Sequence, residues 1–244
     1  MSTLPDRLTF SVRGVSFSLR LISHGTFLMG ADPDVDPDAD EVESPVHPVT
    51  ISRDFYLAET PVTQALYEAV MDCNPSVYKG ASSRPVDSVS WFDSQAFIEK
   101  LNSIIPDGSF SLPTEAEWEF AARGGNLSKG FKYAGSDDID EVAWYYFNCN
   151  TSTCPVAQKL PNELGLYDMT GNVIEWCQDW WTDDYPSDAV TDPVGPAEGI
   201  YRVQRGGGYH TVLESCRNTF RDGFFPTNNY DCFGFRLLFR PSTL

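Results

Sequence analysis

The chain has 244 residues, with 17 lysines and arginines against 35 aspartates and glutamates, so its formal net charge at pH 7 is −18. That length and an apolar content of 41% are enough for one domain with a sizeable core, while the charge argues against nucleic acid or anionic lipid as a partner, because phosphate groups repel such a surface. No apolar run of about 18 residues occurs, so no membrane span is expected.

The hydrophobic pattern predicts short elements joined by long loops. Helix starts are marked by a Ser90-x-x-Asp93 box and a Thr114-x-x-Glu117 box, in which a hydroxyl and a carboxylate cap the first turn. No repeat or linker divides the chain, so we expect one loop-rich α+β domain over 1–244, with few short helices, small antiparallel sheets and both terminal strands in one sheet. In chain order we expect strands over 8–21 and 49–57, helices over 63–71, 90–101 and 114–123, and strands over 203–207 and 234–240.

An acidic run over 32–43 has the composition of a calcium loop. Asp36, Asp38 and Asp40 match the first three ligand positions of an EF-hand, but Glu41 stands where that loop needs glycine and His47 where it needs glutamate. The run is therefore not an EF-hand, and we expect a solvated loop.

The N-terminus and the cysteines bear on the compartment. Residues 1–7 lack the basic-then-apolar order of a secretion signal, so we expect a soluble protein, cytoplasmic as the sequence stands, with surface display as the alternative. The cysteines form no C-x-x-C pair, which argues against a zinc cage. We expect most of them to be buried thiols, with a bridge between Cys149 and Cys154 as the alternative. They are Cys73, Cys149, Cys154, Cys177, Cys216 and Cys232.

Several phrases, in order along the chain, resemble the formylglycine-generating-enzyme (sulfatase-modifying-factor) domain. The resemblance runs from about Phe10 to Phe239 and implies a C-type-lectin-like fold with little regular structure. We expect the tryptophans inside these phrases to pack the core, and their arginines to hold loops through carboxylates or carbonyls. The phrases are FLMG (27–30), ETPVTQ (59–64), RPVDSVSW (84–91), LPTEAEWEFAAR (112–123), PNELGLYDMTGNVIEW (161–176), RGG (205–207) and GFR (234–236).

The resemblance also implies where catalytic metal chemistry would lie. Catalytic members of the family bind copper through two cysteines after the Gly-Gly phrase and oxidise a cysteine of a partner protein; two thiolates suit Cu(I). Those positions fall at Thr211 and Cys216 here, so one thiolate is missing and we expect no copper. A formylglycine-generating-type oxidoreductase, with Cys216 as its catalytic residue, is the alternative.

Structural calcium is a further implication of the resemblance. One family site maps to the side chains of Asp168 and Glu175 with the carbonyls of Gly171 and Val173, and hard oxygens on a tight loop suit calcium. The alternative is that Asp168 makes only turn hydrogen bonds. A second family site expects an aspartate where Ala157 stands, so we do not expect that site.

The C-terminal segment 202–237 resembles the variable region of proteins whose genes are rewritten by diversity-generating retroelements. Its fixed positions would be Arg202–Tyr209, Cys216-Arg217, Arg221, Pro226 and Gly234–Leu237. Such elements mutate template adenines, and a randomised Asn codon cannot become Glu, Lys, Met, Gln or Trp. None of the residues that we assign to the variable set, which lie between the fixed positions, is one of these five types. Glu214 is the exception within the segment, and we treat it as a position that is not mutated.

We therefore expect a non-catalytic protein that binds an unidentified protein ligand through a diversified surface, since rigid aromatics mixed with adaptable polar groups are typical of paratopes. The alternative is that some aromatic residues of the segment, especially Phe220 and Phe233, point into the core. The expected ligand-binding residues are Tyr209, His210, Thr211, Val212, Ser215, Asn218, Thr219, Phe220, Asp222, Phe224, Phe225, Thr227, Asn228, Asn229, Tyr230 and Asp231.

Overall fold

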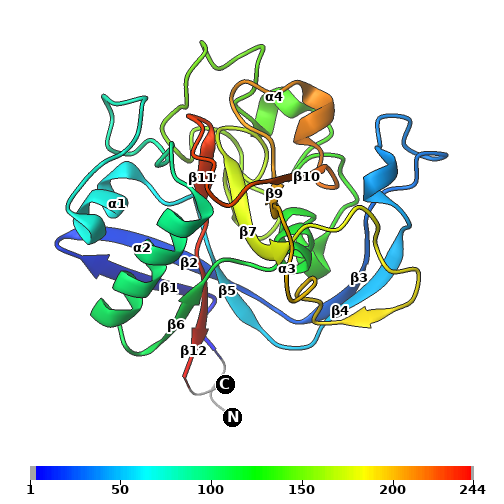
Figure 1. Ribbon diagram of the computed structural model, residues 1–244, viewed down its shortest axis with the longest axis horizontal. Helices are drawn as coiled ribbons and strands as arrows, with labels where there is room; N and C mark the ends of the chain where they lie inside the picture. Colours follow the sequence, from blue (N-terminus) through cyan, green and yellow to red (C-terminus); the bar gives the residue numbers. More distant parts are fainter. Residues whose placement is uncertain (1–3, 243–244) are drawn as a thin grey trace.

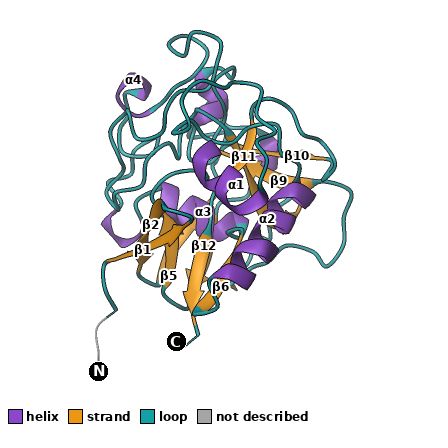
Figure 2. Ribbon diagram, turned by 90° about the vertical axis from the view of Figure 1, so that its left-hand side faces the viewer, coloured by secondary structure: helices purple, strands orange, loops and turns teal. Residues whose placement is uncertain are grey.

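The computed structural model describes residues 4–242, and its largest sheet joins the two ends of the chain. The five strands pair antiparallel throughout. The prediction that N- and C-terminal strands share a sheet is confirmed, and Figure 2 shows both termini leaving from the same end of the molecule. In spatial order the strands are β1 (Arg7–Val12), β2 (Val15–Ile22), β5 (Phe55–Ala58), β12 (Leu238–Pro241) and β6 (Gly108–Ser111).

The three predicted helices are present and begin at the predicted caps. Thr63 caps α1 (Gln64–Met71), while Ser90 and Thr114 form complete capping boxes at α2 (Trp91–Ile104) and α3 (Glu115–Ala122). The pattern did not predict the one-turn helix α4 or the 3₁₀ turns, which are too short to show a helical period. These are α4 (Ile139–Val142), η1 (Glu41–Glu43), η2 (Gly125–Leu127) and η3 (Leu213–Cys216).

Two smaller sheets complete the fold, and each contains one parallel pairing that departs from the expected antiparallel pattern. The four-stranded sheet runs β10 (Arg221–Phe224), β9 (Arg202–Arg205), β7 (Ile174–Trp180), β11 (Phe233–Phe235), with β7 and β11 parallel. The three-stranded sheet runs β3 (Gly25–Met29), β4 (His47–Ile51), β8 (Val190–Thr191), with β4 and β8 parallel. Long loops over the remaining residues cover these sheets (Figure 1).

The core lies on both sides of the largest sheet and is rich in aromatic side chains. One cluster packs α1 and α2 on that sheet and includes a stacked pair, Tyr67 and Phe97, with ring centroids 5.3 Å apart. The other surrounds α3 and is centred on Trp118, which is fully buried, as is Trp176 of the first cluster. Large aromatics thus fill a core that has little regular structure to pack, as expected.

Two further predictions concern the whole chain. Within residues 4–242, no helix combines the length and apolar character that a membrane crossing requires. All six cysteines are free thiols, so Cys149 and Cys154 are not bridged, and four of the six are buried.

Candidate ligand-binding site

Four arginines of segment 202–237 are buried and pair with glutamates from distant parts of the chain. Three of the four pairs, those of Arg217, Arg221 and Arg236, are two-pronged, which fixes both the position and the orientation of a side chain. They attach the C-terminal segment to the loops and helices beneath it. The pairs are Arg205–Glu119, Arg217–Glu43 (2.6 and 2.7 Å), Arg221–Glu115 (2.7 and 2.9 Å) and Arg236–Glu175 (2.8 Å).

Two of these carboxyls, Glu43 and Glu115, have lowered pKa values in spite of their burial. Burial opposes ionisation of Glu43, but hydrogen bonds from Arg217 outweigh it and lower the pKa of the carboxyl. At Glu115 burial again opposes ionisation, and the charges of Arg221 and Arg205 lower its pKa. The prediction that the acidic run is solvated is therefore wrong for Glu43, whose side chain anchors Arg217 in the core.

The expected loop-holding role of the arginines is confirmed at three of four positions. Arg205 also donates to the Thr219 carbonyl, Arg236 donates to the carbonyls of Ala58 and Tyr167, and Arg123 donates to Glu119 and to the Gly30 carbonyl. Arg84 differs, because its Nε and Nη1 are buried without a hydrogen-bond partner among residues 4–242.

Most expected ligand-binding residues reach the surface. The strands that flank them, β10 and β11, lie in the upper half of Figure 1, away from β12. Phe225 and Tyr230 are about half exposed, at 51% and 52%. The exposed side chains are His210, Val212, Asp222, Phe225, Thr227, Asn229 and Tyr230, and the half-buried ones are Thr211, Ser215, Phe220, Phe224, Asn228 and Asp231.

Three expected contact residues are instead buried and hold the segment in place. The Tyr209 hydroxyl lies 2.8 Å from the Tyr78 hydroxyl, Asn218 donates to the Phe131 carbonyl, and the Thr219 hydroxyl accepts from Arg217. Their side chains satisfy buried polar groups, which leaves little of them for a ligand. Phe233 is also buried, against Trp176, whereas Phe220 stays half-buried.

An aromatic cluster supports the exposed rings. Phe224, Tyr230 and Phe233 pack edge to face, with the Tyr230 and Phe233 ring centroids 5.1 Å apart. Phe225 packs in the same manner on Tyr201 at 4.7 Å. Rings held in this way present apolar area at a low cost in conformational entropy.

A pocket of about 160 Å³ opens within this surface. Two of its lining residues, Gln204 and Ile174, were not predicted, because alternation along a strand makes a polar residue such as Gln204 appear to face outward. In the fold both faces of β9 are covered, so Val203 and Gln204 are both fully buried. The pocket is lined by Ile174, Gln204, Arg205, Gly207, His210, Thr211, Ser215, Phe220, Asp222 and Phe224.

One of the two positions that would carry copper ligands, Thr211, lines this pocket, and the other, Cys216, is buried beside it. The Thr211 hydroxyl lies 3.1 Å from the Cys216 sulfur, so the fold does bring the two positions together. Burial raises the pKa of the Cys216 thiol to about 12, which disfavours the thiolate that a metal needs. A hydroxyl and one protonated thiol do not fit copper.

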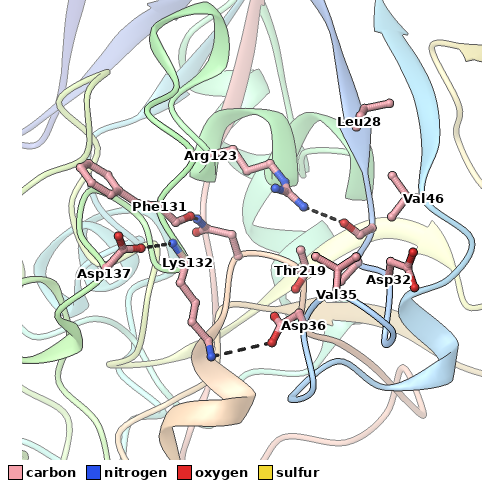
Figure 3. A pocket seen from close by; sticks show the side chains of 14 residues that line it. Leu28, Asp32, Val35, Asp36, Val46, Arg123, Phe131, Lys132, Asp137 and Thr219 are labelled. Atoms are coloured by element: carbon pink, nitrogen blue, oxygen red, sulfur yellow. Dashed lines mark hydrogen bonds and ion pairs between the residues drawn. The ribbon is translucent and has the colours of Figure 1, made fainter.

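A larger cavity, of about 610 Å³, lies on the other side of the segment and has Asn218 and Thr219 in its wall. Figure 3 shows the acidic loop with Val35 and Asp36 facing Phe131 and Lys132 across it. The Lys132 ammonium lies 3.9 Å from an Asp36 carboxylate oxygen, and Arg123 pairs with Glu119, so both cations of this cavity have carboxylate partners.

The segment expected to bind calcium is organised around an arginine. Both Glu175 oxygens accept from Arg236, and one also accepts from the Trp118 indole at 2.7 Å. The Asp168 carboxylate accepts from the Ala157 amide and the Asn172 side chain. Because the Arg236 guanidinium and the Trp118 indole already occupy the Glu175 oxygens, these side chains do not fit calcium as they lie. Within residues 4–242 there is also no group of three His, Cys, Asp or Glu side chains that could hold a metal. Calcium would bind this segment only by displacing Arg236 from Glu175.

Known proteins share both the sequence pattern and the fold. "Chaperone protein LppX" of Paenibacillus barcinonensis is 35% identical over 225 residues, 72% of this chain and 76% of that protein. Serine/threonine-protein kinase Pkn1 of Chlamydia trachomatis is 31% identical, and the match covers 82% of this chain but 35% of the kinase. Formylglycine-generating enzyme of Streptomyces coelicolor is 37% identical over 66% of this chain and 53% of the enzyme.

A solved structure extends the similarity to the whole fold. Treponema denticola variable protein 1 superposes with a TM-score of 0.89 at 31% identity, covering 98% of this chain and all of the other. The model of the sulfatase-modifying factor enzyme 1-like domain matches residues 18–241. The chain therefore belongs to the sulfatase-modifying factor enzyme 1-like family, that of formylglycine-generating enzymes, and has its C-type-lectin-like fold.

Proposed function

We propose that this chain is a non-catalytic ligand-binding protein, that a retroelement diversifies its C-terminal surface, and that its ligand is a protein. One observation carries the proposal: in segment 202–237 most fixed positions are buried and most variable positions reach solvent. The fixed arginines Arg205, Arg217, Arg221 and Arg236 are each at most 3% exposed, while most residues between them reach solvent. The similarity to a variable protein supports the same conclusion.

This division permits variation without loss of the fold. Surface substitutions away from caps and buried networks change stability by roughly 0.5 kcal/mol or less. Breaking a buried ion pair costs several times more. A gene can therefore sample many residues at positions such as His210, Phe225 and Asn229 while the buried arginines keep the scaffold unchanged.

The exposed surface suits a protein ligand. Phe225 and Tyr230 supply rigid apolar area of the kind that forms interface hot spots, and His210, Asp222 and Asn229 supply adaptable hydrogen bonds around them. Nucleic acid is disfavoured as a ligand because the chain carries a net charge of −18.

Oxidation of a partner's cysteine is the activity of formylglycine-generating relatives, and we do not propose it here. That reading requires a two-thiolate copper site, and this chain has Thr211 beside a buried Cys216 thiol whose pKa is raised.

Selection from a phage-displayed random peptide library on the immobilised protein tests the binding function. We expect clones whose affinity falls by about tenfold or more against Phe225→Ala or Tyr230→Ala, because exposed aromatic anchors dominate such contacts. The control is Ile104→Ala, which truncates a 42% exposed side chain at the far end of α2 and should leave binding unchanged. Failure to select any clone, or clones equally indifferent to all three variants, would overturn the proposal.

A further inference from the structure

Gln204 is a buried side chain with no partner. It lies in β9, is 0% exposed, and neither its Nε2 nor its Oε1 forms a hydrogen bond with any group in residues 4–242. Buried amides are normally paired, since an unpaired one loses its hydrogen bonds to water and gains nothing in return. A strand position could hold an apolar residue at no such cost, so the unpaired amide points to a role outside the folding of the chain.

Gln204 is one of the residues that line the 160 Å³ pocket in the variable surface. In the sheet, Gln204 stands directly opposite Asp222 of β10, and such cross-strand neighbours project from the same face. Phe220 and Phe224 line the pocket with apolar surface, and His210 lies at its wall. A pocket that is mostly apolar with a few fixed polar groups is the usual form of a site for one small chemical group.

The pocket favours an uncharged guest. Burial raises the pKa of the Asp222 carboxyl and lowers the pKa of the His210 imidazole, so both groups are shifted toward their neutral forms. Asp222 and the net charge of −18 also disfavour an incoming carboxylate. An ammonium group could donate to Oε1 but would leave Nε2 unpaired, because it has no acceptor.

A carboxamide satisfies both atoms at once, since it carries a donor and an acceptor in one plane. We propose that this pocket binds the side-chain amide of a glutamine or asparagine from the protein ligand, with Gln204 as the specificity-determining residue. The inference rests on the proposed ligand-binding function and names the group that the site recognises. Because Gln204 belongs to the fixed positions, every variant of the surface would keep this side-chain amide. The variable lining residues, such as His210 and Phe224, would change around it.

The direct test follows the Gln204 side-chain NH₂ resonance in ¹⁵N-labelled protein during titration with N-acetyl-L-glutamine methylamide. N-acetyl-L-methionine methylamide is the control probe, since it has a similar length and no side-chain amide. We expect a saturable shift of the Gln204 resonance with the first probe only. Equal shifts with both probes, or none with either, would overturn the inference.

Variants separate recognition from structure. Gln204→Leu should weaken binding of the glutamine probe at least tenfold, because the apolar side chain leaves the probe's amide unpaired. It should not lower the melting temperature of the free protein, because no hydrogen bond is lost. The matched control is Gln95→Leu, whose amide donates to Gln178 at 3.1 Å and lies outside the pocket. A Gln204→Leu melting temperature several degrees below that of Gln95→Leu would show that Gln204 is structural and overturn the inference; if that variant does not fold, Gln204→Met replaces it.

The outcomes distinguish this inference from the proposed function. If library peptides depend on Phe225 while the glutamine probe never moves the Gln204 resonance, the function stands and the carboxamide inference fails. If the probe binds and no peptide can be selected, the carboxamide site stands and the protein-binding function fails.

Discussion

The hydroxyl oxygen of Thr211 lies 3.1 Å from the sulfur of Cys216. Thr211 also lines the 160 Å³ pocket of the variable surface. The family's two copper-binding positions are thus adjacent in space, and only the identity of the first residue separates this site from a dithiol. The Thr211 hydroxyl also exchanges hydrogen bonds with the backbone of Gly208, so the threonine has become part of the loop's own structure.

Thr211→Cys should create a Cu(I) site under reducing conditions, because two adjacent thiolates suit a soft monovalent ion and a hydroxyl with one thiol does not. Competition with a chromophoric Cu(I) chelator measures the affinity of the wild-type protein and the variant. Thr211→Ser and the double variant Thr211→Cys, Cys216→Ala are the controls and should bind no better than the wild type. Wild-type affinity equal to that of Thr211→Cys would contradict our reading of the site.

Glu43→Ala should lower the free energy of unfolding by about 3–5 kcal/mol, because it leaves the buried Arg217 guanidinium without its two-pronged partner. Urea unfolding measures the change. Asp72→Ala removes an exposed carboxylate that pairs with Arg13 and Lys100, and it should lower the free energy of unfolding much less, because water and salt screen exposed ion pairs. Equal losses in the two variants would show that the Glu43–Arg217 pair does not anchor the C-terminal segment.

The residues involved show which features could be predicted from sequence. The three main helices were predictable because their caps, such as Ser90 with Asp93, lie within one turn of each other. The Glu43–Arg217 pair was not, since its partners are 174 residues apart and no local pattern links them. The parallel pairing of β7 with β11 was missed for the same reason. The exposure of Phe225 and Tyr230 could be predicted from the sequence. The burial of Tyr209 could not, because only the fold shows that the Tyr78 ring packs against the Tyr209 ring.

Asp179 should make stability depend on pH between about 4 and 8. Burial raises the pKa of its carboxyl to about 8, with the charge of Glu115 adding to the shift, while an unfolded aspartate titrates near ~3.9. Between these values the folded protein holds the extra proton, so the contribution to stability is full below about pH 4 and is lost as the pH rises toward 8.

Asp179→Asn removes this titration and keeps an oxygen that can accept from the Glu115 amide. The free energy of unfolding of the variant minus that of the wild type should therefore rise from pH 5 to pH 8 in urea titrations. The Arg13 hydrogen bond lowers the pKa of the Asp72 carboxyl to about 2, so the corresponding difference for Asp72→Asn should stay flat over this range. A flat difference for Asp179→Asn would mean that its carboxyl is ionised throughout.

Calcium should leave the melting temperature unchanged, because Arg236 already supplies the positive charge beside Glu175. An ion that binds only the folded state raises stability by mass action, so melting in excess calcium and in chelator compares the two cases directly. A rise of several degrees that Asp168→Ala abolishes would show that calcium displaces the arginine and restores the family's metal site.

Sequencing the 3′ end of this gene across a population of its host, together with the flanking DNA, tests the central claim most directly. We expect substitutions concentrated in codons 210–233, sparing those of the buried arginines such as Arg217 and Arg221 and tracking adenines in a nearby template copy. Such a pattern would establish that this surface is diversified. A uniform 3′ end without a template copy would contradict the claim and leave a family member with a single fixed binding surface.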